Sequence, residues 1–441
     1  MSRRRGPLTG LLAAELISLT GTRMSMVALP WFTLATTGSA ARAGVVAFAE
    51  MLPYVLACGL GGPLLDRLGH RRVSVVADLA SAPVLLAVPV LHHAGRLDFG
   101  LLVTLIALVG LLRGFGETAK RVLFPDAVTA SGMALTRATA LHDGLGRLAT
   151  LLGAPLAGVL ILALEAPAVL ALDAVSFLLA SLVVAALVPA PADPVRTVAP
   201  APAPARPGRW ASYLRELGEG LRFLFRDPLV GSVTVLLLVT NLADAAYSSV
   251  LAPVWAREVA GSPAALGALS ASFAVGAVLG NVVFTALAPR VPRFATFAVG
   301  FLVGGAPRFL ALALVDRLWA VYLISFVAGL GLAAINPILG AITYERIPEA
   351  LRARVLGLGH AISWGGIPLG GLLAGYCADL ATPAVAALVF GGAYLAVTVW
   401  PLLSPTWRRL DHPASGAPSP VAAPRPTDDE APAPGDVART G

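Results

Sequence analysis

Charged residues are scarce in this chain, and lysine is almost missing. Only 13% of the 441 residues are Asp, Glu, Lys or Arg, whereas soluble globular domains carry about 25%. Lys120 is the single lysine, and the only cysteines, Cys58 and Cys377, lack metal or redox spacing. This composition excludes a soluble enzyme, and we expect the two thiols to be lone residues inside helices.

Several sequence signals of catalysis are also missing. There is no G-x-x-x-x-G-K-[ST] phosphate loop, because the residues before Lys120 read GETA. The chain has no HExxH and no GxSxG, the usual signals of a hydrolase inside the membrane. We therefore expect no enzyme, no cofactor and no metal site, and an ion gradient remains as the source of energy.

Long hydrophobic runs make up most of the sequence, of which 57% is hydrophobic. About 20 helical residues cross the roughly 30 Å of hydrocarbon in a bilayer. Lipid cannot satisfy exposed backbone groups, so such runs must be helices. We predict an all-α membrane protein with twelve spans, near residues 10–35, 43–64, 73–93, 98–119, 140–163, 167–188, 229–252, 265–288, 294–315, 318–342, 354–377 and 382–403.

The arginines predict the orientation of these spans. Basic residues gather before the first span, after even-numbered spans and after the last, whereas segments after odd-numbered spans hold only Arg42, Arg96, Arg257 and Arg317. By the positive-inside rule, both termini are cytoplasmic in an inner (plasma) membrane, with the first run an uncleaved span. The net charge of +7 then needs no nucleic-acid partner.

A Pro/Ala-rich stretch divides the spans into six and six. We predict an N-terminal bundle over 1–188, a cytoplasmic linker over 189–211 and a C-terminal bundle over 229–403. Residues 212–228 between them predict an amphipathic helix in the membrane plane. The Pro/Ala/Asp-rich end, 404–441, predicts a disordered cytoplasmic tail.

The two halves share an internal repeat. Residues 144–158 and 357–371 align without gaps, and seven of their fifteen positions are identical. Parallel repeats of six helices, with a substrate site between them, are the architecture of one large transporter class. Small residues and prolines in these fifth and eleventh spans suit surfaces that rock, although ordinary tight packing would use them equally well. The residues concerned are Gly153, Pro155, Gly158, Gly366, Pro368 and Gly371.

One charged turn stands between the second and third spans. It reads GGPLLDRLGHRR, and topology alone does not explain its aspartate. The pattern G-x-x-x-D-R-x-G-x-R resembles the signature loop of the major facilitator superfamily, apart from His70, where that family more often has arginine. The resemblance implies a cytoplasmic latch between the halves, with Asp66 facing a helix end, Arg67 and Arg71 as its partners, and Gly62 and Gly69 at close approaches.

Further phrases are similar to bacterial efflux members of that superfamily, of the enterobactin-exporter type. They include MVALPWFTLATTGSA in the first span, RVLFPDAV after the fourth and LDAVSFLLAS in the sixth. The resemblance implies export of drugs, siderophores or secondary metabolites.

Charges inside the spans are candidate functional residues, because each costs about 2.5–3.5 kcal/mol at the bilayer centre. Arg113 and Glu117 share a helical face, and they either couple protons or form a structural pair. Asp244 could exchange a proton within a cycle or be satisfied by a facing residue. Asp173 and Glu50 could face a wet vestibule. The candidate coupling residues are Arg23, Glu50, Arg113, Glu117, Asn241, Asp244 and Arg308.

The sequence thus favours a monomeric, proton-coupled antiporter that exports small amphipathic organic molecules by alternating access. Its partners would be the lipid bilayer, the proton gradient and a small-molecule substrate. A proton-coupled importer on the same scaffold remains an alternative, and a membrane receptor without transport is a third.

Overall fold

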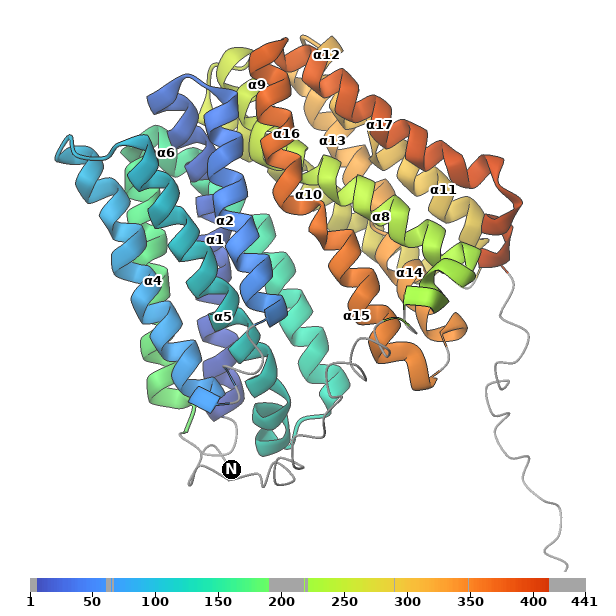
Figure 1. Cartoon of the computed structure of the whole chain (residues 1–441), viewed down its shortest axis with the longest axis horizontal. Helices are drawn as coiled ribbons and strands as arrows, with labels where there is room; N and C mark the ends of the chain where they lie inside the picture. Colours follow the sequence, from blue (N-terminus) through green and yellow to red (C-terminus); the bar gives the residue numbers. More distant parts are fainter. Residues whose placement is uncertain are drawn as a thin grey trace, which may run out of the picture.

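The computed structural model describes residues 6–60, 65, 67–189, 218, 221–288, 290–347 and 349–411, and these ranges contain helices and no strand. The helices form two bundles (Figure 1). The first bundle holds α1 (Gly6–Thr37), α2 (Ala40–Leu60), α4 (His70–His93), α5 (Phe99–Ser131) and α6 (Leu135–Leu187). The second bundle holds α8 (Pro228–Ala246), a π-helix (Tyr247–Leu251), α9 (Ala252–Glu258), α10 (Pro263–Leu287), α11 (Arg293–Gly304), α12 (Ala306–Leu314), α13 (Leu318–Leu332), α14 (Ile335–Arg346), α15 (Glu349–Gly365), α16 (Ile367–Leu380) and α17 (Pro383–Leu403).

The described helices include 11 segments that are long and apolar enough to cross a membrane. One of these, α6, has 53 residues and is two helices joined at Glu165, whose φ of 68° and ψ of 162° are not helical. Each part of α6 is long enough to cross a bilayer at 1.5 Å per residue. The predicted twelve spans are therefore confirmed, and the fifth and sixth meet in a sharp turn at Glu165.

Short polar side chains set the starts of several spans. Asp98 accepts a hydrogen bond from the Leu101 amide at the start of α5. Ser262 and Thr382 cap α10 and α17 in the same way. Such caps satisfy amides that have no partner within the helix. Three of these spans thus begin where the sequence supplies a side-chain acceptor.

Two spans of the second bundle are irregular next to charged residues. The π-helix at 247–251 follows Asp244 and precedes Pro253, which has no amide to continue the α-helical pattern. The predicted span 294–315 is broken into α11 and α12 at Gly305, two residues before Pro307. Tyr247 and Arg308, which lie at these irregularities, both line a compartment between the bundles.

The two bundles contact each other mainly at one end, the upper end in Figure 1. This upper end carries the loops at 38–39, 94–98, 259–262 and 381–382. The lower end carries the start of α1, and there the bundles diverge. Helix α16 packs against α2, and α10 packs against α6. These contacts join the bundles near the upper end, where the Gly375 backbone meets Ala40 and Ala41.

The chain remains folded somewhat beyond the last span. Residues Pro405–Leu410 form a 3₁₀ helix in which Trp407 and Leu410 are buried. The Trp407 ring stacks on Phe297 with centroids 5.5 Å apart. The tail was expected to begin at Ser404, and burial of this tryptophan extends the folded part to Asp411. The rest of the predicted tail lies outside the described residues.

The described residues include only the end of the predicted connection between the bundles. The linker 189–211 and most of 212–220 lie outside the described residues. Residues 221–226 are helical, as the amphipathic pattern predicts. Leu224 from this segment is buried against Ile347 and Val355, whereas Phe225 is exposed.

Candidate functional site: a central cavity between the bundles

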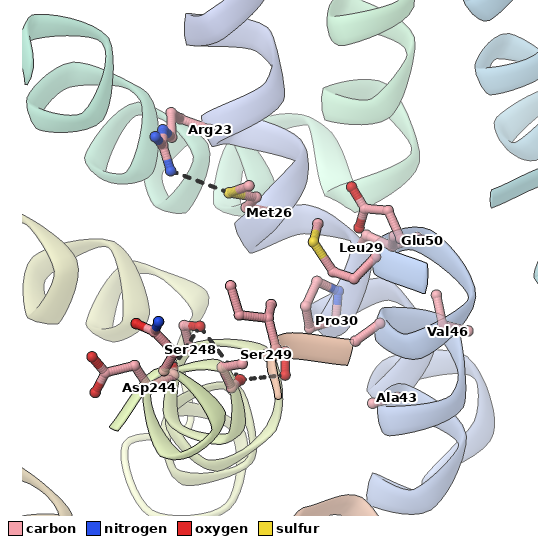
Figure 2. A pocket seen from close by; sticks show the side chains of 15 residues that line it. Arg23, Met26, Leu29, Pro30, Ala43, Val46, Glu50, Asp244, Ser248 and Ser249 are labelled. Carbon is pink, nitrogen blue, oxygen red and sulfur yellow. Dashed lines mark hydrogen bonds between the residues drawn. The ribbon is translucent and has the colours of Figure 1, made fainter. Parts of the chain in front are cut away.

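A cavity lies between the bundles, and residues from both form its walls (Figure 2). One compartment of about 330 Å³ is lined by Arg23, Glu50, Asn241 and Asp244, with an apolar surface that includes Met26 and Leu29. Adjoining compartments of about 340 and 420 Å³ include Arg308 and the Arg113–Glu117 segment. All seven predicted coupling residues thus line the space between the bundles, and their roles stay predictions.

Arg23 of α1 is common to all three compartments. Its Nη1 lies 3.5 Å from the sulfur of Met26, and its Nε is buried with no hydrogen-bond partner. The backbone of α6 comes very close to it, since a Cβ placed on Gly153 would lie 2.5 Å from the Cβ of Arg23. The absence of a side chain at Gly153 therefore lets α6 hold the stem of Arg23.

Asp244 and Arg308 form an ion pair in the second bundle. The Arg308 side chain is 7% exposed, whereas that of Asp244 is 40% exposed and reaches the cavity. Four aromatic rings surround the guanidinium at 4.9–5.8 Å, from Tyr247, Phe273, Phe309 and Tyr394. Cation–π attraction and the carboxylate together offset the cost of burying Arg308.

The break at Gly305 explains how Arg308 reaches this position. A Cβ on Gly305 would lie 1.9 Å from the ring of Tyr394, so only glycine lets that ring approach. Asn241, one turn before Asp244, donates instead to the carbonyl of Ser363, at 3.0 Å. Asp244 is therefore paired with an arginine that follows a helix break, and Asn241 holds α8 against α15.

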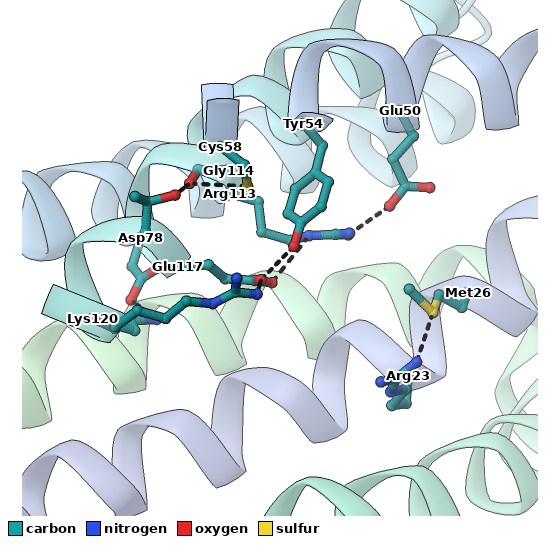
Figure 3. A network of polar contacts seen from close by, with 12 residues as sticks. Arg23, Met26, Glu50, Tyr54, Cys58, Asp78, Arg113, Gly114, Glu117 and Lys120 are labelled. Atoms are coloured by element: carbon teal, nitrogen blue, oxygen red, sulfur yellow. Dashed lines mark hydrogen bonds and ion pairs between the residues drawn. The ribbon is translucent and has the colours of Figure 1, made fainter. Parts of the chain in front are cut away.

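A second charged network lies in the first bundle (Figure 3). Arg113 of α5 forms an ion pair with Glu50 of α2 at 2.6 Å and a longer one with Glu117 at 3.6 Å. The Tyr54 hydroxyl donates to Glu117 at 2.6 Å, and its ring lies 4.8 Å from the Arg113 guanidinium. The predicted contact between Arg113 and Glu117 exists, but Glu50 is the closer partner.

A buried ion pair in the same bundle was absent from the predicted site. Lys120 lies 2.6 Å from Asp78 of α4, and their side chains are 6% and 3% exposed. Asp78 is a carboxylate inside the predicted span 73–93, and Lys120 ends the run that contains Arg113. A carboxylate within an apolar run and the only lysine of the chain were the signals that could have found the pair.

Asp173 does not face a wet vestibule, contrary to expectation. It is 2% exposed and accepts hydrogen bonds from Ser25 of α1 at 2.5 Å and from Ser176 at 2.9 Å. Gly21 leaves room for this cluster, because its Cβ would lie 2.3 Å from Asp173. Asp173 thus joins α1 to α6, and serine hydroxyls satisfy its carboxylate.

The signature loop is described only in part. Gly62 and Asp66 lie outside the described residues, and Arg67 is exposed. Arg71 donates to the carbonyls of Val188 and Ala185, both at 2.6 Å, and so caps the end of α6. Gly69 does not serve a close approach, since a Cβ there would meet nothing within 4 Å. Glycine suits the position because its φ is +83°.

The repeated glycines make equivalent contacts in the two halves. Gly153 packs against α1, the first span, and Gly366 packs against α8, the seventh. Gly158 meets Gly267 of α10, the eighth span, while Gly371 meets Ala47 of α2, the second. Pro155 lies within α6 and Pro368 in the first turn of α16. A rotation that exchanges the bundles preserves this pattern, as expected of a structural repeat.

Asp379, which was not among the predicted site residues, joins the bundles at the upper end. Asp379 of α16 accepts hydrogen bonds from the Ser39 hydroxyl at 2.6 Å and from the Ala40 and Ala41 amides at 2.9 and 3.0 Å. Arg257 of α9 also donates to the carbonyl of Leu34 at the end of α1. These contacts close the upper end. The signal for Asp379 was weak, because it stands at the end of an apolar run.

Two bundles of six spans with a central cavity between them are the architecture of one large class of membrane transporters. The sequence profile of the Major Facilitator Superfamily matches residues 11–243 and 233–435. The chain therefore belongs to the major facilitator superfamily, and the predicted family is confirmed.

Relatives and solved structures agree with this membership. The chain is 28% identical to the "Multidrug efflux pump Tap" of Mycolicibacterium fortuitum, over 92% of this chain and 98% of the relative. It is 30% identical to the protein of the same name from Mycobacterium tuberculosis strain H37Rv, over 86% and 88%. The solved nucleoside transporter NupG is 14% identical with a TM-score of 0.70, over 91% of this chain and 98% of NupG, and supports the fold alone.

Proposed function

We propose that this transporter is a proton-coupled antiporter that exports small amphipathic organic molecules by alternating access. The observation that carries the proposal is Asp244, a carboxylate that reaches the central cavity while paired with the buried Arg308. The names of the relatives, multidrug efflux pumps, support export. We further propose that it acts as a monomer in the inner (plasma) membrane.

The distribution of arginine supports an orientation with the lower end in the cytoplasm. Arg67, Arg72, Arg121 and Arg137 are exposed toward that end. By the positive-inside rule, this distribution supports a cytoplasmic location for both termini. The described conformation, closed at the upper end, is then inward-facing and ready to accept a molecule from the cell or the inner leaflet.

Protonation of Asp244 would release its attraction for Arg308 and change the balance between conformations. A ligand or proton shifts such an equilibrium by its difference in affinity for the two states. One proton moving through about 100 mV supplies roughly 2.3 kcal/mol, which is about a 50-fold concentration ratio. A single proton per cycle therefore suffices for useful export.

Inside-out membrane vesicles with an acidified lumen test this proposal, with the amphipathic dye rhodamine B as substrate. We expect the dye to accumulate in the lumen, accumulation to stop when ionophores collapse the gradient, and Asp244→Asn to abolish it. Asp316→Asn, a change in an exposed loop of the same bundle, is the control and should have no effect. Accumulation without a gradient would refute coupling, and gradient-driven loss of dye from the lumen would indicate import.

A further inference from the structure

We propose that Arg23 recognises the substrate and that the exported molecules carry an anionic oxygen, such as a carboxylate, that pairs with its guanidinium. This inference rests on the proposed function, because it names the chemical class of molecule that the central cavity accepts. Three features support it: the position of Arg23, the absence of a carboxylate at ion-pair distance among the described residues, and the pairing of the carboxylates around it.

The position of Arg23 is fixed at its stem and open at its head. Gly153 brings the α6 backbone against its Cβ, so the stem has little freedom. The guanidinium lies beside the Met26 sulfur (Figure 2), and Arg23 lines all three compartments of the cavity. A side chain held in this way loses little further conformational entropy when it binds a ligand.

Arg23 lacks the counter-charge that other cations of the cavity have. Arg113, Lys120 and Arg308 each lie within ion-pair distance of a carboxylate. Among the ion pairs of the described residues, none includes Arg23. Its neighbour, the Met26 thioether, is only a weak acceptor. A partly buried guanidinium whose Nε has no hydrogen-bond partner favours an anion that can supply paired oxygens.

The carboxylates that line the same space already have partners. Glu50 is paired with Arg113, Asp244 with Arg308, and Glu117 with Arg113 and Arg121. Glu15, at the wider part of the cavity, lies 2.7 Å from His142. A lipophilic cation would therefore have to displace an existing partner, whereas an anion meets a donor that is unoccupied.

The wall of the cavity that holds Asp244 indicates which other groups the ligand carries. Asp244 keeps 40% of its side chain exposed, and Asn241 and Ser248 line the same compartment. The remaining lining is largely apolar, including Leu29, Pro30 and Ile367. The cavity thus matches an amphipathic molecule with an apolar body, an anionic group at Arg23, and a hydrogen-bond donor toward Asp244.

A matched pair of dyes tests this inference by equilibrium binding to the purified full-length protein in detergent. Rhodamine B carries a free carboxylate, and its ethyl ester keeps the same cationic ring system without that charge. We expect rhodamine B to bind at least about ten-fold more tightly than the ester, as a charge-assisted pair implies. Arg23→Gln should remove this difference by weakening rhodamine B alone, and Arg23→Lys should retain part of it because the charge remains.

Arg96→Gln, in an exposed loop of the same bundle, is the control and should leave both affinities unchanged. Equal binding of the two dyes by the wild-type protein, an equal loss of both in Arg23→Gln, or binding of neither dye would overturn the inference. Carboxylate selectivity in a protein that does not accumulate rhodamine B in energised vesicles would overturn the antiporter proposal alone. Gradient-driven accumulation of both dyes with equal affinity would overturn the role of Arg23 alone.

Discussion

The carboxylate of Asp379 in the second bundle caps the helix that begins at Ala40 in the first, with 2.9 Å between the acceptor oxygen and the Ala40 amide. Ser39 also caps α2, since its Oγ accepts a hydrogen bond from the Arg42 amide at 3.2 Å, and its hydroxyl donates to the same carboxylate. The start of α2 is thus completed by the other bundle. Separation of the bundles at the upper end must leave these amides without their acceptor.

Asp379→Ala should therefore shift the protein toward a conformation open at the upper end. Loss of a helix cap costs about 1 kcal/mol, which changes the ratio of two conformations roughly five-fold. Distances between spin labels on Arg96 and Asp316, in exposed loops of the two bundles, report this shift after both cysteines are replaced. Asp98→Ala removes a cap within one bundle and should leave the distances unchanged. The same change in both variants would argue against a gate at Asp379.

The contact between Gly158 and Gly267 predicts an effect of added volume. A Cβ on Gly158 would lie 3.0 Å from the Gly267 Cα and from the Pro263 carbonyl oxygen. Gly158→Val should therefore wedge α6 away from α10, populate the conformation open at the upper end and slow dye transport several-fold. Gly392→Val, on a helical surface with free space, is the comparison. Unchanged transport and label distances in Gly158→Val would show that this contact is not needed for closure.

The buried pair of Lys120 and Asp78 predicts a large loss of stability when one partner is removed. Lys120→Met leaves the Asp78 carboxylate 2% exposed and unpaired, and breaking a buried pair in this way costs about 3–5 kcal/mol. The double variant Asp78→Leu/Lys120→Met should recover much of that loss, because no isolated charge remains. Thermal unfolding in detergent measures both.

Arg121→Met is the matched control for Lys120→Met. Arg121 is the next residue, but its side chain is 61% exposed and lies 3.7 Å from Glu117. An exposed pair contributes little, so the unfolding temperature should hardly change. Equal unfolding temperatures for Lys120→Met and Arg121→Met would show that burial of the Lys120–Asp78 pair contributes nothing to stability.

The pair of Asp244 and Arg308 predicts a separation of stability from transport. Asp244→Asn leaves Arg308 charged among aromatic rings and should lower the unfolding temperature. Asp244→Asn/Arg308→Gln removes both charges and should restore much of the stability while transport driven by the pH gradient stays absent. Recovery of gradient-driven transport in the double variant would identify the pair as structural only.

The length of the hydrophobic runs was enough to predict the number of spans, because bilayer thickness constrains any helix that crosses it. The repeated glycines also led to the correct equivalence of the fifth and eleventh spans. Asp244 was identified as a candidate because a carboxylate inside a span is costly. Its partner could not be assigned, since Arg308 reaches it only after the break at Gly305, which depends on how closely Tyr394 packs.

Other residues escaped prediction because their roles depend on distant contacts. Asp379 lies at the end of a span, where a charge is ordinary. Its role depends on the hydrogen bonds that it accepts from the amides of Ala40 and Ala41. Asp173 is satisfied by Ser25, which is 148 positions away in the chain. Local sequence sets the cost of each buried charge, but only the packing of α1, α2, α6 and α16 selects the group that compensates it.

The burial of Lys120 beside Asp78 has a practical chemical consequence. Because the chain contains no other lysine, the Lys120 ε-amine is its one side-chain amine that an acylating reagent can convert to a stable amide, and α4 and α5 shield it. The rate at which an active ester modifies that amine therefore reports how often the first bundle opens far enough to expose Lys120. Mass spectrometry of a single peptide would give that measurement in native lipid, with no engineered label.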